Sequence, residues 1–207
     1  MIYHLCQYLK PFLPVLNVVH YVSFRAIASL LSTLAFSLAL GDWFIRASQR
    51  LFRSKVREFT PETHKVKNNL PTMGGLLILL VVVINVLLWC DLTQPRVWLM
   101  LACLLGFGAI GAWDDWCKIS KRRGISARPK FILQVSVALG VILGWLYLTG
   151  TSTIISFPFL KALHPNLGII FVFWAVFVLV GCSNAVNLTD GLDGLAIGSL
   201  LLNFATF

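Results

Sequence analysis

The sequence has few charged residues, and acidic residues are the scarcer kind. Only 12% of its 207 residues are charged, and eight of them are Asp or Glu. A soluble globular domain is about one quarter charged, so that class is excluded. Because 58% of the residues are hydrophobic and the mean hydropathy is +0.84, we predict an all-α, polytopic integral membrane helical bundle that forms a single domain over residues 1–207.

The sequence also lacks the residue spacings of common metal and redox sites. Its five cysteines form no CxxC pair, and its four histidines show no HExxH pattern, which argues against a zinc site. The first twenty residues contain two prolines and lack the pattern of a cleavable signal peptide. The net charge of +9 does not indicate a nucleic-acid partner, because basic residues of membrane proteins concentrate in cytoplasmic loops.

Long apolar stretches fill most of the chain. A bilayer-crossing helix needs about 20 residues, and five stretches reach or approach that length. A sixth begins near Leu195 and stops at the chain end, while residues 2–22 are interrupted by Pro11 and Pro14 and predict an interfacial or re-entrant lead-in. We predict five full transmembrane helices and a truncated sixth, the five lying at residues 26–45, 73–90, 97–113, 131–148 and 167–188.

Basic residues mark two of the connections between these stretches. Seven of the 17 Lys and Arg residues lie between Arg46 and Lys67, and six lie between Lys118 and Lys130. The positive-inside rule places both segments in the cytoplasm, so the N-terminus is expected outside. Three polar motifs from distant parts of the chain then share the cytoplasmic face of the membrane.

The first motif is the pair Asp114–Asp115, at the end of an apolar stretch. A carboxylate near bilayer depth is costly to keep charged, so it is rarely there without a use. Adjacent helical residues do not face the same way, but at a helix end both carboxylates could reach one cation, or divide the roles of metal ligand and base. The alternative is a solvated helix end whose acids pair with nearby cations such as Lys118.

The second motif repeats a polar residue every three positions, along roughly one stripe of a helix. Its amide and carboxylate oxygens are the hard ligands that Mg²⁺ prefers, and the glycines beside it would let a ligand approach closely. The alternative is a polar helix end with a turn in DGLDG. The members of the stripe are Asn184, Asn187, Asp190 and Asp193.

The third motif is the basic segment 64–75, which precedes the second apolar stretch. Its lysines could meet phosphate oxygens, and the helix start after Pro71 would offer free N–H groups to an anion. The alternative is ordinary topology-setting charge, and most of the segment from Lys118 to Lys130 suits acidic lipid head groups. Together the three motifs favour a Mg²⁺-assisted reaction between a phosphorylated lipid and a soluble phosphorylated donor.

In their order and spacing, these motifs resemble those of the bacterial phospho-N-acetylmuramoyl-pentapeptide transferases, within the polyprenyl-phosphate N-acetylhexosamine-1-phosphate transferases. The motifs are PTMGG at 71–75, DDWCK at 114–118 and NAVNLTDGLDGLA at 184–196, and the resemblance runs from residue 46 to the chain end. The other branches favour PTPR-x-GG and a different run before DG-x-DG.

The resemblance implies a reaction of peptidoglycan synthesis in the bacterial inner membrane. UDP-N-acetylmuramoyl-pentapeptide and undecaprenyl phosphate would give lipid I and UMP, with Mg²⁺ as cofactor. The resemblance implies catalytic roles for Asp114 and Asp115, one as base and the other to orient cation or phosphate, and leaves open which does which. It also implies a metal contact at Asn187 and substrate contacts at Lys67, Thr72, Lys130, Asp190 and Asp193.

Two features depart from the family pattern. Asn69-Leu70 stands where the family has Gly-Thr before PTMGG. Asn accepts a left-handed conformation, but any contact of the Thr hydroxyl is lost. The family also has further spans, a third acidic position and a His-rich loop. We therefore expect this chain to be the N-terminal part of such an enzyme, and to be inactive or nearly so by itself.

Other interpretations stay open. A related transferase of N-acetylglucosamine-1-phosphate to a polyprenyl phosphate would use a different donor, and an inactive truncated fragment would use none. A cation or proton transporter is disfavoured, because its relay acids should lie mid-span. The oligomeric state is undecided, a homodimer included.

Overall fold

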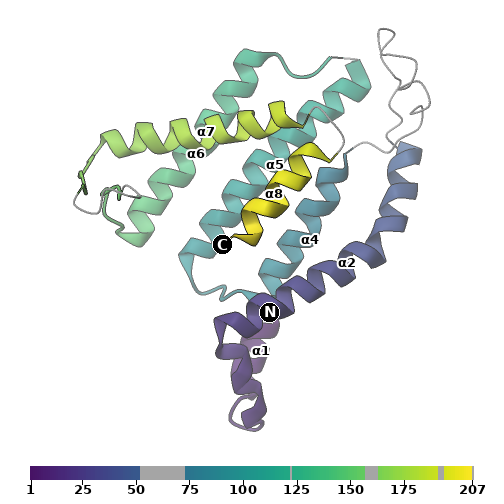
Figure 1. The fold of residues 1–207 in the computed structure, drawn as a ribbon, viewed down its shortest axis with the longest axis vertical. Helices are drawn as coiled ribbons and strands as arrows, with labels where there is room; N and C mark the ends of the chain where they lie inside the picture. The colour runs from purple at the N-terminus through teal and green to yellow at the C-terminus, as the bar shows by residue number, and fades with distance from the viewer. Residues whose placement is uncertain (52–72, 122, 157–162, 191–193, 207) are drawn as a thin grey trace. The chain divides into compact units, whose positions relative to one another are not determined.

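The computed structural model describes residues 1–51, 73–121, 123–156, 163–190 and 194–206 (Figure 1). Within these ranges the β-type pairing is limited to an isolated bridge between Ile154 and Asn166, so the all-α prediction is confirmed. The elements are α1 (Ile2–Leu9), the 3-10 helix η1 (Pro14–His20), α2 (Val22–Leu51), α4 (Gly74–Trp89), α5 (Pro95–Lys121), α6 (Ala127–Thr149), α7 (Ile170–Thr189) and α8 (Leu195–Ala205).

Four helices are long and apolar enough to cross a membrane: α2, α5, α6 and α7. They correspond to four of the five expected spans, so a membrane helical bundle is confirmed. The remaining expected span, residues 73–90, forms α4, whose 16 residues rise about 24 Å at 1.5 Å per residue. The expected sixth span begins at Leu195 as α8. The total number of spans stays a prediction.

The chain divides into two compact units, Met1–Ser126 and Ala127–Phe207. In the first unit, α4 packs against both α2 and α5, and its core includes Val81 of α4 with Leu101 and Ile110 of α5. In the second unit, α7 packs against α6 and, over a smaller contact, α8. The expectation of a single domain stays a prediction.

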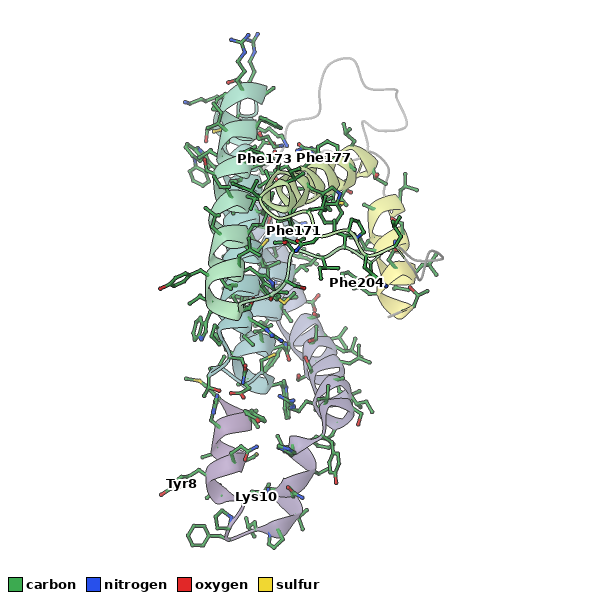
Figure 2. The ribbon with its side chains drawn as sticks, turned by 90° about the vertical axis from the view of Figure 1, so that its left-hand side faces the viewer. Tyr8, Lys10, Phe171, Phe173, Phe177 and Phe204 are labelled. Carbon is green, nitrogen blue, oxygen red and sulfur yellow. The ribbon has the colours of Figure 1, made fainter. Side chains whose placement is uncertain are left out.

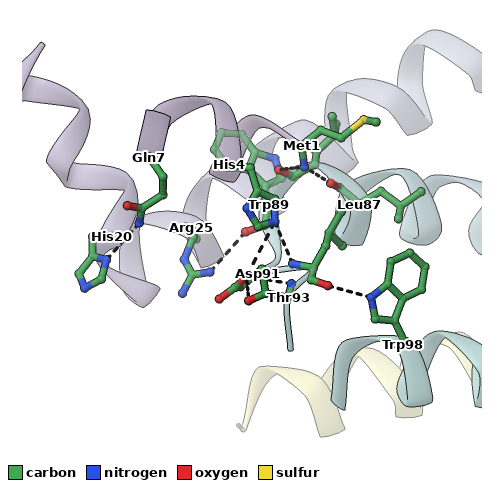
Figure 3. A network of polar contacts seen from close by, with 12 residues as sticks. Met1, His4, Gln7, His20, Arg25, Leu87, Trp89, Asp91, Thr93 and Trp98 are labelled. Carbon is green, nitrogen blue, oxygen red and sulfur yellow. Dashed lines mark hydrogen bonds and ion pairs between the residues drawn. The ribbon is translucent and has the colours of Figure 1, made fainter. Parts of the chain in front are cut away.

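The segment of residues 2–22, before the first span, is interrupted near Pro11 and Pro14, as the sequence predicts. Helix α1 ends before Pro11, and η1 starts at Pro14. The segment is fixed to the end of α4 by polar contacts (Figure 3). The amino group of Met1 donates to the carbonyls of Leu87 and Leu88. The interfacial or re-entrant placement of this segment stays a prediction.

Arg25 of α2 and the turn between α4 and α5 make further contacts with this region. The Arg25 guanidinium lies 4.7 Å from the centre of the Tyr3 ring, a cation–π distance, and donates to the Trp89 carbonyl at 3.4 Å. Next in the turn, the Thr93 hydroxyl donates to Asp91 Oδ1 at 2.7 Å and lowers the pKa of that carboxyl. The turn therefore holds an ionised acid at neutral pH.

A buried amide joins α2 and α4 in the first unit. Asn85 is only 3% exposed. Its Oδ1 accepts a hydrogen bond from the Ser32 hydroxyl, and its Nδ2 donates to the Val81 carbonyl at 2.9 Å. The Trp89 indole N–H donates to the Ser32 oxygen at 3.0 Å. Such bonds fix how two apolar helices are aligned in a membrane. Hydrophobic burial does little to select one alignment there, because the lipid around the helices is equally apolar.

A second amide pair joins α6 and α7. Asn184 Nδ2 donates to Gln134 Oε1 at 2.9 Å and to the Val180 carbonyl at 2.8 Å. Gln134 is 4% exposed, so neither water nor lipid replaces its partner easily. The polar stripe expected on α7 therefore begins with a residue whose amide is hydrogen-bonded to α6.

Replacing Gln134 by Leu should lower the stability of the protein, because it leaves the Asn184 amide without its partner on α6. We expect a loss of about 0.5–2 kcal/mol in the free energy of unfolding, measured by unfolding in detergent. Ser136→Ala is the matched control, since the Ser136 hydroxyl donates to Ile132 of its own helix. Equal stability of Q134L and S136A would show that the amide pair does not hold α6 to α7.

The second unit presents large apolar side chains outward. Phe173 and Phe177 lie one turn apart on α7 and are 72% and 76% exposed, and Phe204 on α8 is 76% exposed (Figure 2). A water-soluble protein rarely exposes apolar area on this scale. This surface suits lipid or a further helix, in keeping with the membrane assignment.

Candidate active site at the end of α5

Helix α5 continues beyond its apolar stretch and carries both acids of the first motif. The expected span ended at residue 113, but α5 extends to Lys121, two turns past Trp113. Lys118 follows Asp115 by three residues and Asp114 by four. Because all three residues lie on the helix, these are spacings at which their side chains can meet. The longer helix therefore holds the two acids and Lys118 in one helical cluster.

The two acids have different surroundings. The side chain of Asp114 is 7% exposed, whereas that of Asp115 is 45% exposed. The Lys118 ammonium lies between them, 2.9 Å from Asp114 Oδ2 and 2.8 Å from Asp115 Oδ1. The alternative of ion pairing is thus confirmed for Lys118. It does not remove a chemical role, because a half-exposed ion pair is weak and Asp115 stays accessible.

Asp114 also binds the chain that follows α5. Its Oδ1 accepts a hydrogen bond from the backbone N–H of Ile125 at 2.8 Å. A Cβ atom added at Gly124 would lie 2.6 Å from the same oxygen. The backbone therefore passes so close to the carboxylate that a side chain at position 124 would force the carboxylate or the backbone to shift.

The end of α7 carries the second group of site residues. Helix α7 ends at Thr189, and the N–H of Asp190 donates to the Val186 carbonyl at 3.1 Å. Asn187 and Asp190 are both exposed, in contrast to Asn184, so their oxygens are accessible to a ligand. Asp193 lies outside the described residues.

Of the remaining predicted site residues, the structure describes one. Lys130 lies near the start of α6 and has an interaction within the protein. Lys67 and Thr72 lie outside the described residues. Met73, which follows them, has φ +67° at the N-cap of α4 and is buried. A left-handed conformation is uncommon for a residue other than glycine and marks a local constraint in the PTMGG motif.

The described residues of the site fall into two groups, one in each unit. Asp114 and Asp115 form one cluster in the first unit. Asn187 and Asp190 form another at the end of α7, in the second unit, and Lys130 lies one turn before the Gln134 that contacts α7. Each group is described within its own unit.

The donors present suit a hard cation. Among the described residues no three His, Cys, Asp or Glu side chains lie close enough to share a metal. Mg²⁺ does not require such a cage, because it is commonly held by one or two carboxylates together with waters and substrate phosphates. The exposed oxygens of Asp115, Asn187 and Asp190 fit that chemistry. They do not resemble the nitrogen and sulfur donors of a zinc site.

Two residues important here were missed by the sequence analysis. Gln134 is a polar residue inside an apolar run, which is by itself a signal of a structural or functional contact within a membrane. Gly124 was passed over as part of a basic loop. Only the structure shows that the backbone at position 124 passes close to the Asp114 carboxylate.

Comparison with known proteins shows to which family the chain belongs. The model of glycosyl transferase family 4 matches residues 97–207, more than half of the chain. Curated proteins named phospho-N-acetylmuramoyl-pentapeptide-transferase are also similar. The one from Citrifermentans bemidjiense is 42% identical over 210 residues (100% of this chain, 59% of the relative).

Two further relatives carry the same name. The protein from Aquifex aeolicus is 45% identical (96% of this chain, 56% of the relative), and that from Desulfotalea psychrophila is 46% identical (100% and 58%). The chain thus spans somewhat under two thirds of the length of these relatives. The similarity covers the Asp pair, the α7 motif and the apolar helices alike, and the chain belongs to glycosyl transferase family 4.

Proposed function

We propose that the protein transfers phospho-N-acetylmuramoyl-pentapeptide from its UDP-linked donor to undecaprenyl phosphate, giving lipid I and UMP. The observation that carries the proposal is the cluster at the end of α5, where a membrane-length helix presents one accessible carboxylate beside one buried carboxylate. The names of the relatives give the transferred group, phospho-N-acetylmuramoyl-pentapeptide, and the family resemblance implies the UDP-linked donor and the undecaprenyl phosphate acceptor. The reaction would occur at the cytoplasmic face of the bacterial inner membrane, with the N-terminus outside.

The reaction is the attack of a lipid phosphate on a sugar-bearing phosphate. An oxygen of undecaprenyl phosphate bonds to the phosphorus that carries the sugar, and the bond from that phosphorus to UMP breaks. Three to four negative phosphate charges, about two on the diphosphate and one or two on the lipid phosphate, meet in this step, so positioning and charge neutralisation dominate its catalysis. Mg²⁺, when bound, would supply much of that neutralisation.

Each residue of the site then has a proposed role. One acid of the pair Asp114 and Asp115 would take a proton from the lipid phosphate, and the other would orient the cation or the phosphate. Asn187 would hold the metal through its exposed amide oxygen. The remaining roles come from the family resemblance, with phosphate and donor contacts at Lys67, Thr72, Lys130, Asp190 and Asp193.

Donor competition tests the proposal. Membranes containing the protein, expressed from its complete reading frame, are supplied with undecaprenyl phosphate and either UDP-N-acetylmuramoyl-pentapeptide or UDP-N-acetylglucosamine, and UMP release is measured. We expect release with the pentapeptide donor only. Equal release from both donors, or from UDP-N-acetylglucosamine alone, would assign the protein to the related N-acetylglucosamine-1-phosphate transferases.

A further inference from the structure

We propose that the cavity between α2 and α4 holds one acyl chain of an anionic phospholipid, whose phosphate is bound by Arg46 and Arg50 at the end of α2. This lipid is not a substrate of the proposed reaction, so the inference goes beyond the proposed function and does not depend on it. We name the cavity together with the two arginines the α2–α4 lipid site.

The cavity lies within the first unit and has apolar walls. Its volume is about 470 Å³, and residues of α2 and α4 line it together with Leu105 of α5. Apart from the Trp43 indole and the Ser48 hydroxyl, the lining consists of hydrocarbon side chains. Ser48 is 2% exposed and already has an interaction within the protein. Such walls suit a hydrocarbon ligand and not water, which needs two to four polar partners.

The cavity lies at the depth of one leaflet of the membrane. Its walls on α4 run from Leu76 to Val83, within the first three turns of that helix. Its walls on α2 run from Trp43 to Ser48, close to the end of that helix. These ends of the two helices adjoin the basic segment 46–67, so the positive-inside rule places the cavity in the cytoplasmic leaflet. Acyl chains of that leaflet surround the helices at this depth.

The size of the cavity distinguishes a lipid chain from a helix. A helix is about 10 Å across with its side chains and rises about 5.4 Å per turn, so one turn fills roughly 400 Å³. The cavity therefore has room for little more than one turn, which is too short for a further membrane span or for a helix of a second copy. A single hydrocarbon chain is thinner and can enter from the side, because Trp43 and Leu80 in the walls are 61% and 46% exposed.

Two cations of α2 lie beside the cavity. Arg46 follows the lining residue Trp43 by three positions, and Arg50 follows the lining residue Ala47 by three, so each arginine lies one turn from the wall on the same side of the helix. Both arginines are exposed, and in the part of the chain that the structure describes neither forms an ion pair. Arg46 and Arg50 are four residues apart, so both guanidinium groups can reach one phosphate.

The residues next to the arginines agree with a lipid head group at this place. Trp43 is exposed, and indole rings concentrate at the level of the head groups. Asp42 precedes Arg46 by one turn, but the two arginines leave the local charge positive. Basic residues at the cytoplasmic surface attract anionic lipids, so the α2–α4 lipid site should prefer an anionic head group to a zwitterionic one.

Photo-crosslinking in detergent tests the site. Protein expressed from its complete reading frame is mixed with phosphatidylglycerol that carries a photoreactive group in its acyl chain, and the labelled peptides are identified by mass spectrometry. We expect labelling within residues 43–48 and 76–83. Excess unlabelled phosphatidylglycerol should compete for the site. Zwitterionic phosphatidylethanolamine should compete about tenfold less well, because it lacks the net charge that the arginines attract.

Two variants address the two parts of the site. Ala47→Phe fills the cavity and should abolish the labelling, whereas Ala35→Phe, at an exposed alanine of α2 that does not line the cavity, should leave it unchanged. The double variant Arg46→Gln with Arg50→Gln keeps the cavity and should remove the preference for the anionic competitor. Its control is Arg96→Gln, which removes an exposed arginine near the start of α5 and should keep the preference.

Three results would overturn the proposal. They are a wild type that is not labelled at these residues, equal labelling of Ala47→Phe and Ala35→Phe, and an unchanged head-group preference in the double arginine variant. The last of these decides alone if Ala47→Phe fails to insert. An unlabelled wild type whose dimer dissociates in Ala47→Phe would assign the cavity to a second copy. Labelling needs no turnover, so a failure of UMP release would count against the proposed function only.

Discussion

Asp115→Asn is expected to lower the turnover of lipid I formation by about three orders of magnitude, while the protein still inserts into the membrane. Asp115 is the accessible acid of the pair. Replacing its carboxylate by an amide removes the charge that would orient a cation or accept a proton. Losses of about 10²–10⁴ are typical when such a group is removed. Steady-state UMP release by the protein expressed from its complete reading frame measures the effect.

The control for this variant is Asp91→Asn. Asp91 lies in the turn before α5, at the opposite end of that helix from Asp115, and belongs to none of the motifs. Its replacement should change turnover by no more than about twofold, because it lies outside the proposed site. Turnover of Asp115→Asn at the level of Asp91→Asn would show that Asp115 only forms the exposed ion pair with Lys118 and takes no part in the reaction.

Removal of divalent cations should abolish the activity. The proposed site gathers phosphate charge around oxygen donors, and phosphoryl transfer usually uses Mg²⁺ to neutralise that charge. UMP release should fall to background in excess EDTA and return when Mg²⁺ is restored. Undiminished turnover in EDTA would exclude the metal from the proposed mechanism.

A variant of Asn187, the proposed metal-binding residue, gives a second test of the role of Mg²⁺. Asn187→Ala should raise the Mg²⁺ concentration that gives half-maximal rate, because it removes an exposed amide oxygen at the end of α7. Asn184→Ala is a contrasting variant. Asn184 binds Gln134 across the α6–α7 contact, so its loss should lower stability and leave the Mg²⁺ requirement unchanged.

Much of the fold follows from the sequence because apolar length determines where a membrane helix can form. The start of α8 at Leu195 and the interruption near Pro11 and Pro14 were predicted correctly. Helix ends were predicted less well. Helix α5 extends to Lys121 although its apolar stretch ends near Trp113, because polar residues continue a helix once their side chains pair along it.

The residues of the site were predictable, but their contacts within the protein were not. The pattern of adjacent acids pointed to Asp114 and Asp115. It could not show that the chain returns after α5, so that the Ile125 N–H meets one acid and not the other. In the same way, spacing placed Asn184 in a stripe with Asn187, whereas only the packing of α6 shows that Asn184 belongs to a helix contact. Both distinctions depend on contacts between residues distant in sequence.

The most direct test of the account is the identity of the product. Membranes containing the protein expressed from its complete reading frame are given UDP-N-acetylmuramoyl-pentapeptide, undecaprenyl phosphate and Mg²⁺, and the lipid extract is examined by mass spectrometry. The account predicts a lipid-linked diphosphate that carries the muramoyl-pentapeptide, formed in equal amount with UMP and absent from the Asp115→Asn sample. Absence of this product from the wild-type sample, or its undiminished formation by Asp115→Asn, would contradict the account.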